Sequence, residues 1–370
     1  MPHTHHAHPM RRYATAAAVA VLGVATLAGC SGAQNESATG ADDLLMVSEV
    51  RSLTNPYEAA WVEGSKAYAD SVGVDLKVIV YGGDSQNALS QLQSVLATGK
   101  KVLLNINPNT SADTPAIVRA VQNSGGCAVT QWSKPADLHP WDVGDGWASY
   151  VSYDGVKEGA DTGDALGASI GGKGGVIAIQ GLLANEISKT RYQGFTEGIA
   201  QHPGVTILDN QPADFDRNKA YTTTQTLLNK YGDKVNGIWA ATDAMALGAL
   251  QAVREKGKAG QIKVASAADA TPEGLEAIQR GEMVSTYTTD PYFNGAMGLA
   301  ICHQIATGER KVSDLSELQR EFYVDQTLIT ADNVARHIER PTDQQIVDSV
   351  RDPFSRIVGP IESDPSSNEE

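Results

Sequence analysis

The chain has 370 residues, with 29 Lys and Arg residues against 44 Asp and Glu residues and a formal net charge of −15. At roughly 150 residues per domain this length suggests two domains, and 41% hydrophobic with 20% charged residues is typical of a folded globular protein. The acidity argues against a nucleic-acid-binding protein, which needs a basic surface to displace the counterions of phosphates.

Residues 1–29 are predicted to be a secretory signal peptide. Arg11 and Arg12 precede an uncharged apolar stretch, residues 14–27, which is too short for a stable membrane span. The stretch ends in the sequence LAGC, whose cysteine is Cys30. This sequence resembles the lipobox of bacterial lipoproteins, and the resemblance implies that Cys30 is lipidated and holds the exported protein at the extracytoplasmic face of the cell membrane through the anchor only.

Cleavage before Cys30 leaves 27 basic and 44 acidic residues, a net charge of −17. The small and polar residues that follow, together with Cys30 itself, make residues 30–43 a predicted flexible tether. Residues 363–370 are also polar and are predicted to be a disordered tail.

From residue 44 onward, apolar runs of strand length alternate with segments whose apolar residues recur at helical spacing. The elements expected in the first half are strand 44–47, helix 57–72, strand 76–80, helix 85–96, strand 102–106, helix 115–122 and strand 128–130. This alternation predicts an α/β domain with a parallel sheet and helices on both faces.

A second series of alternating helices and strands, which predicts a second α/β domain, begins at a boundary placed near Tyr153 and Asp154. Its expected elements are helix 155–170, strand 176–179, helix 187–200, strand 205–208, helix 217–231, strand 237–240, helix 244–256, strand 262–266, helix 272–280 and strand 284–287. Periodicity places a further helix, 293–307, with this second domain. Ligands of open α/β sheets bind at the carboxyl ends of the strands, so two such sheets predict a binding cleft between the domains.

The sequence favours a binding protein over an enzyme and predicts no cofactor or metal. There is no phosphate-binding lysine motif and no nucleophile elbow, and the glycine-rich segment 171–175 precedes a strand, which indicates a turn. After the leader, no His or Cys pair has zinc-ligand spacing. Cys127 and Cys302 lie in apolar stretches far apart in the sequence, which favours two buried free thiols, although an exported protein can form a disulfide.

Several short segments, in order, resemble the ribose-type family of periplasmic sugar-binding proteins. The resemblance extends from about residue 44 to about residue 329. The matching segments are NPY at 55–57 before a helix with Gly64, NP at 107–108, RYQGF at 191–195, QPADFDR at 211–217, TDAMALGA at 242–249 and DATPEG at 269–274.

The resemblance implies two Rossmann-like lobes with parallel sheets and a ligand cleft between them. Three hinge crossovers are implied, near Asp154, after about Thr289 and near Glu321, and helix 293–307 then packs on the N-terminal lobe. The lobes are expected to comprise residues 44–153 with about 290–320, and residues 154–289 with about 321–362.

The resemblance also implies the ligand site. Tyr57 and Phe215 match family positions that stack on the apolar faces of a sugar, although either could instead be a core residue. Four polar residues match positions that bond hydroxyls. They are Asn55 and Asp269, which could instead cap helices, Asn107, which could belong to a turn, and Arg191, which could lie on a surface helix.

Four further candidates are departures from the family pattern. Trp132 stands where the family often has a carboxylate, Thr242 where it has an asparagine, Thr289 where it has an amide, and Glu58 where it has a second aromatic residue. Trp132 offers a stacking surface and an indole N–H, while an inward Glu58 would favour a cationic or hydroxyl-rich ligand. The departures imply a ligand other than ribose, and a pentose, hexose or polyol is preferred.

The function implied is that of a monomeric substrate-binding lipoprotein of a carbohydrate ABC importer. It would capture a small sugar or sugar alcohol and deliver it to a membrane permease and its ATPase. A sensing role stays open, as the ligand-binding partner of a chemoreceptor or sensor kinase or as the receptor of a furanose-like signal molecule. A transcription regulator with the same two lobes is disfavoured because the leader and tether occupy the place of a helix-turn-helix.

Overall fold

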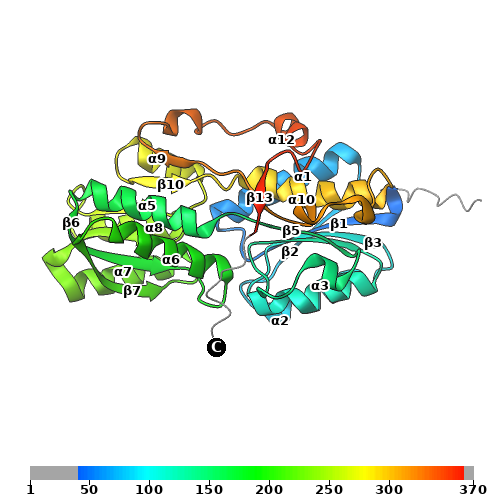
Figure 1. Ribbon diagram of the computed structural model, residues 1–370, viewed down its shortest axis with the longest axis horizontal. Helices are drawn as coiled ribbons and strands as arrows, with labels where there is room; N and C mark the ends of the chain where they lie inside the picture. Colours follow the sequence, from blue (N-terminus) through cyan, green and yellow to red (C-terminus); the bar gives the residue numbers. More distant parts are fainter. Residues whose placement is uncertain (1–40, 362–370) are drawn as a thin grey trace, which may run out of the picture. The chain divides into compact units, whose positions relative to one another are not determined.

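The computed structural model describes residues 41–361, which form two α/β lobes (Figure 1). The signal peptide, Cys30, most of the tether and the C-terminal tail lie outside the described residues. A short 3-10 helix, η1 (Ala41–Asp43), leads into the first strand. Within the described part of the chain, no helix is both long and apolar enough to cross a bilayer.

The first lobe is built on a seven-stranded sheet with the order β13-β11-β5-β4-β3-β1-β2. Neighbouring strands are parallel, except that β13 pairs with β11 in the antiparallel direction. The strands are β1 (Leu44–Val50), β2 (Leu76–Val80), β3 (Lys101–Ile106), β4 (Cys127–Gln131), β5 (Trp147–Ser152), β11 (Glu321–Val324) and β13 (Ile357–Pro360).

Helices cover both faces of this sheet. Side chains of a strand alternate between the two faces, so Met46 joins the core beneath α1 and α10, whereas Val47 joins the core beneath α2 and α3 (Figure 1). The helices of this lobe are α1 (Pro56–Val72), α2 (Ser85–Leu96), α3 (Thr114–Asn123), α4 (Pro140–Val143), α10 (Pro291–Ala306), α11 (Glu317–Arg320) and α12 (Asp343–Ser349).

The second lobe is built on a four-stranded parallel sheet with the order β7-β6-β8-β9, beside a two-stranded antiparallel pair, β10 and β12. Its strands are β6 (Lys173–Gln180), β7 (Gly204–Pro212), β8 (Val235–Ala240), β9 (Lys263–Ser266), β10 (Ser285–Tyr287) and β12 (Leu328–Thr330). Its helices are α5 (Gly155–Ser169), α6 (Glu186–Ala200), α7 (Arg217–Tyr231), α8 (Asp243–Glu255) and α9 (Pro272–Gln279).

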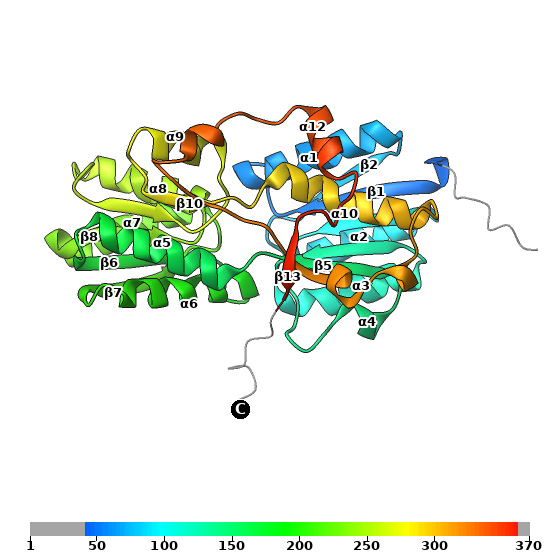
Figure 2. The same ribbon diagram turned by 45° about the horizontal axis from the view of Figure 1, so that its top comes forward.

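The chain passes between the lobes at the three expected places, between β5 and α5, between β10 and α10, and between β11 and β12. It then returns once more, because α12 packs on α1 and β13 pairs with β11 (Figure 2). Residues 321–362 were expected in the second lobe, but β11, α12 and β13 belong to the first lobe. β11 extends the first sheet beside β5, and β13 covers the edge that β11 would otherwise expose.

Helix α10 packs on the first lobe, as the family resemblance implied and periodicity did not. This packing also corrects the expectation of two free thiols. Cys127 on β4 and Cys302 on α10 form a disulfide, with their Cα atoms 5.5 Å apart. Their separation of 175 residues in sequence gives no sign of the contact, because it depends on the return of α10 to the sheet.

Candidate functional site

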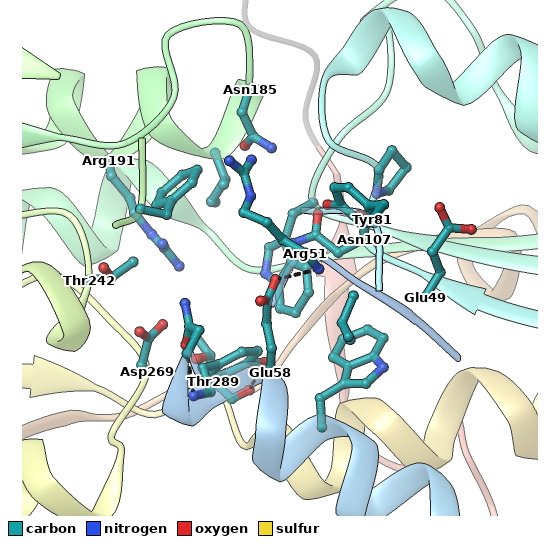
Figure 3. Close-up of a pocket in the computed structure, with 18 residues that line it drawn as sticks. Glu49, Arg51, Glu58, Tyr81, Asn107, Asn185, Arg191, Thr242, Asp269 and Thr289 are labelled. Atoms are coloured by element: carbon teal, nitrogen blue, oxygen red, sulfur yellow. Dashed lines mark hydrogen bonds between the residues drawn. The ribbon is translucent and has the colours of Figure 1, made fainter. Parts of the chain in front are cut away.

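A cavity of about 70 Å³ lies between the strand and helix ends of the two lobes (Figure 3). At about 10–15 Å³ for each water molecule, this cavity has room for about five to seven waters, which suits a ligand of monosaccharide size. The cavity brings together all ten candidate residues, namely Asn55, Tyr57, Glu58, Asn107, Trp132, Arg191, Phe215, Thr242, Asp269 and Thr289. Their role in binding stays a prediction.

The N-terminus of α1 supplies the first of these residues. Asn55 caps the helix, because its Oδ1 accepts from the backbone N–H of Tyr57 at 2.9 Å. The Tyr57 hydroxyl donates to the carbonyl of Thr289 at 2.8 Å and accepts from the Asn294 amide at 2.9 Å. The Tyr57 ring is therefore fixed against the hinge segment that precedes α10.

Glu58 lines the cavity, but its carboxylate is engaged by the loop after β1. Oε1 accepts from the backbone N–H of Arg51 at 3.2 Å, and Oε2 accepts from that of Ser52 at 2.7 Å. Burial raises the pKa of Glu58 to about 7, although these two hydrogen bonds and the charge of Arg51 oppose the shift. Glu58 thus shapes the loop that carries Arg51, instead of presenting a free carboxylate for a cationic ligand.

Trp132, just after β4, contributes an aromatic wall with an unused donor. Its ring lies 5.7 Å from Tyr57, 5.4 Å from Trp61 and 6.3 Å from Tyr153, measured between ring centres. The indole Nε1 is buried and has no hydrogen-bond partner within residues 41–361. The Nε1 of Trp61 differs, since it donates to Ser48 at 2.9 Å.

Arg191 enters the cavity from the second lobe because α5 and α6 pack very closely. A side chain at Gly159 would place its Cβ 2.0 Å from the carbonyl oxygen of Arg191, so only glycine permits this approach. The approach lets Arg191 Nε donate to Glu158 at 2.6 Å, while Nη1 donates to the carbonyl of Ala241 at 3.2 Å. Burial raises the pKa of Glu158, and the charge of Arg191 and its hydrogen bond oppose this shift.

Asp269 faces Arg191 across the second-lobe side of the cavity (Figure 3). Burial raises the pKa of Asp269 well above its ordinary value, the charge of Asp243 adds to the shift, and Arg191 opposes it. Asp243 in turn fixes the loop before α9, because it accepts from the backbone N–H of Thr271 at 2.7 Å and from the hydroxyl of Thr286 at 2.7 Å.

Unusual backbone conformations gather at this cavity. Within the described residues, non-glycine residues with positive φ are Asp214, Phe215, Trp132, Asp269 and Ala270, and each lines the cavity or adjoins a residue that does. Such conformations cost energy and are typical of functional sites. The Phe215 ring also requires Gly181 opposite it, where an added Cβ would lie 2.1 Å from the ring.

Polar atoms without partners surround the same space. Beside Trp132 Nε1, the buried atoms without a hydrogen-bond partner among residues 41–361 that belong to cavity residues are Asn107 Oδ1, Asn185 Oδ1, Thr242 Oγ1, Thr289 Oγ1 and both carboxyl oxygens of Glu49. Buried polar atoms in proteins are normally hydrogen-bonded. An occupant that both donates and accepts hydrogen bonds would satisfy them.

Sequence reasoning missed several residues of the cavity wall, including Glu49, Arg51, Tyr81 and Asn185. Glu49 is fully buried, and burial together with the charge of Asp113 raises its pKa to about 8. One signal was available, because an acidic residue within an apolar strand is uncommon unless it has a partner or a function. Asn185 and Tyr81 offered no comparable signal.

Within residues 41–361, no group of three or more His, Cys, Asp or Glu side chains has an arrangement that could hold a metal ion. Of the charged residues at the cavity, Arg191 is paired with Glu158, and Arg51 donates to Asn109 and to the backbone carbonyl of Asp214. The arrangement suits capture of a neutral, hydroxyl-rich molecule.

Comparison with known proteins places the chain among binding proteins. The model of a periplasmic binding protein domain matches residues 49–310. The ribose import binding protein of Salmonella typhimurium is 30% identical over 280 residues, which cover 76% of this chain and 88% of that protein. The xylitol-binding protein of Mycolicibacterium smegmatis is 26% identical over 277 residues, covering 75% of this chain and 74% of that protein.

A solved structure shows the same fold. The crystal structure of a twin-arginine translocation pathway signal protein from Burkholderia phytofirmans has a TM-score of 0.83 and 36% sequence identity, and the match covers 86% of this chain and 98% of that one. The two-lobed α/β architecture is therefore that of the matched proteins.

Proposed function

Because the chain belongs to the ribose-type family of periplasmic sugar-binding proteins, we propose that it captures a small, uncharged sugar or sugar alcohol in the cavity between its lobes. The observation that carries the proposal is the set of buried polar atoms without partners around the rings of Tyr57, Trp132 and Phe215. A hydroxyl group both donates and accepts, and the apolar face of a sugar ring packs on aromatic rings.

Charge supports a neutral ligand. Arg191 is paired with Glu158, and the carboxyl group of Glu58 is bonded to backbone N–H groups beside Arg51. These two groups already have partners, so a charged ligand would gain little from either of them, and burying its charge would be costly. Members of the pentose, hexose and polyol classes avoid this cost.

The test is titration calorimetry of the chain beginning at Ser31. The panel contains pentoses, hexoses, acyclic polyols and inositols, with glucosamine and glucuronic acid as charged controls. We expect saturable binding of at least one neutral compound, accompanied by a rise in melting temperature, because a ligand that binds only the folded state stabilises it. Binding of a charged control alone, or of no member of the panel, would contradict the proposal.

We further propose that the protein is an exported, monomeric lipoprotein, anchored through Cys30, which delivers its ligand to an ABC permease and ATPase. Family membership and the sequence of the leader support this role. Cys30→Ser should abolish incorporation of labelled fatty acid and release the protein from membranes. Deletion of the gene should abolish uptake of the ligand found by calorimetry, whereas normal uptake with loss of a ligand-dependent signal would favour sensing.

A further inference from the structure

The side chain of Arg51 extends from the end of β1 in the first lobe to the second lobe. Its Nη2 donates to Oδ1 of Asn109 at 2.6 Å, and its Nη1 donates to the backbone carbonyl of Asp214 at 3.4 Å. The guanidinium carbon lies 6.0 Å from the centre of the Phe215 ring. One planar group therefore joins a first-lobe loop to the loop between β7 and α7.

Asn109 is a fixed anchor for this group. Its amide nitrogen donates to the carbonyl of Gly83 at 3.1 Å and to the hydroxyl of Ser85 at 2.9 Å. The backbone carbonyl of Asn109 accepts from the side-chain amide of Asn185, in the second lobe, at 3.5 Å. Asn109 thus takes part in two contacts between the lobes, one directly and one through Arg51.

The second-lobe end is also held in place. Asp214 and Phe215 have φ values of 53° and 60°, a backbone conformation that persists only where its surroundings support it. The Asp214 carboxylate pairs with Lys219 at 2.6 Å within the second lobe. Arg51 therefore bonds to the backbone of this loop and not to the Asp214 carboxylate, and this contact helps to fix the Phe215 ring at the cavity.

Arg51 lines both the ligand cavity and an adjoining groove, whose walls also include Arg217 and Lys219. In Figure 3, Arg51 lies between Asn185 and Glu58 and faces Arg191 across the cavity.

We propose that Arg51 is a positioning residue that latches the two lobes together over the cavity and sets the residence time of the ligand. The proposal rests on the proposed function, because it takes the cavity as the ligand site. The contacts of Arg51 with Asn109 and Asp214 can exist together only while the lobes are closed, so they stabilise the closed state over the open one. Stabilising the closed state slows dissociation more than it changes association.

The first readout needs no ligand. Spin labels at Ser90→Cys on α2 and Asn229→Cys on α7, both exposed positions, report the distance between the lobes in the chain beginning at Ser31. We expect a short-distance population in the unliganded protein that Arg51→Ala reduces by about tenfold, the effect of one charge-assisted hydrogen bond. Arg51→Lys keeps the charge but cannot bond both partners, and should reduce the population nearly as much.

The second readout uses xylitol and D-ribose as probes in stopped-flow tryptophan fluorescence. Arg51→Ala should raise the dissociation rate constant about tenfold and change the association rate constant by less than about threefold. Arg217→Ala is the matched control, because it removes a cation from the same groove while its partner, Glu273, belongs to its own lobe. It should leave both readouts unchanged.

The outcomes separate the latch from the proposed function. If neither probe binds the wild-type protein while Arg51→Ala still reduces the short-distance population about tenfold, the contact of Arg51 between the lobes is supported and xylitol and D-ribose are not ligands. If Arg51→Ala leaves the distances unchanged, the latch is wrong whatever binds. If Arg217→Ala reproduces the effect of Arg51→Ala, the effect belongs to the charge of the groove, and the latch is again wrong.

Discussion

Arg191 and Glu158 form a fully buried ion pair, with 2.6 Å between Nε and Oε2, on the second-lobe side of the cavity. The pair orients the guanidinium so that its remaining N–H groups are available to a ligand, while Asp269 lies on the same side as an acceptor. Arg191 is thus held by Glu158, which does not line the cavity.

Arg191→Ala and Asp269→Ala should each weaken the affinity for the ligand found by calorimetry by about 1.5–3 kcal/mol, because each removes buried hydrogen bonds and leaves a ligand hydroxyl without its partner. Calorimetry on the folded variants measures the loss. Arg217→Ala is the control, since Arg217 pairs with Glu273 at 2.7 Å at the cleft mouth, outside the cavity. Unchanged affinity in both cavity variants would show that the ligand does not use this side of the site.

Trp132→Phe should weaken affinity by about 1 kcal/mol, because it removes the unpartnered indole N–H but keeps an aromatic surface. Trp61→Phe removes an N–H that already donates to Ser48. It should therefore lower the free energy of unfolding and leave affinity nearly unchanged. Equal effects of the two substitutions on affinity would mean that Trp132 does not donate to the ligand.

Reduction of the Cys127–Cys302 disulfide should lower the free energy of unfolding by about 2–4 kcal/mol, since the cross-link restricts the unfolded chain. Neither cysteine lines the cavity, so affinity should change little. Urea unfolding with and without reductant measures the effect, and the Cys127→Ser, Cys302→Ser double variant should show no response to reductant.

Glu49→Gln should raise stability more at pH 8 than at pH 5. Burial raises the pKa of Glu49 from its ordinary 4.5 to about 8, so the folded state holds the proton over a range in which the unfolded state has lost it. The contribution of Glu49 to stability is therefore greatest below pH 4.5 and falls as pH rises to 8, by up to about 1.4 kcal/mol for each pH unit. Glutamine has no such dependence.

The difference in unfolding free energy between Glu49→Gln and wild type, measured across this pH range, tests the assignment. Glu58→Gln serves as a comparison, because the carboxyl group of Glu58 accepts two backbone hydrogen bonds that an amide can only partly replace. A difference that stays constant from pH 5 to pH 8 would mean that water reaches the Glu49 carboxyl.

Much of the fold was predictable because it follows from patterns of residues close together in the sequence. The alternation of strands and helices up to Tyr287 follows from apolar periodicity, and the motif around Arg191 marked the second-lobe wall of the cavity. β5 was missed because two serines interrupt its sequence, WASYVS, so it lacks the continuous apolar run that marked the neighbouring strands. The last strands were misplaced because edge pairing, such as that of β13 with β11, is a long-range property.

The candidate site divides in the same way. Residues within family-like segments, such as Asp269 and Asn107, could be named from the sequence. Arg51 could not, because its importance lies in reaching Asn109 and Asp214, which are 58 and 163 residues away in the chain. The disulfide was judged wrongly for the same reason, since only the packing of α10 on the first sheet brings its two cysteines together.

The disulfide has a consequence for the covalent integrity of the molecule. The second-lobe elements from α5 to β10 all lie between Cys127 and Cys302 in the sequence. The bond therefore closes this part of the chain into a covalent ring. A protease that cuts one loop of the second lobe would leave two pieces that still migrate as one band on a non-reducing gel. Tension applied to the two ends of the chain would be carried across the bond and would not stretch the elements from α5 to β10, whereas β12, which follows Cys302, stays in the loaded part of the chain.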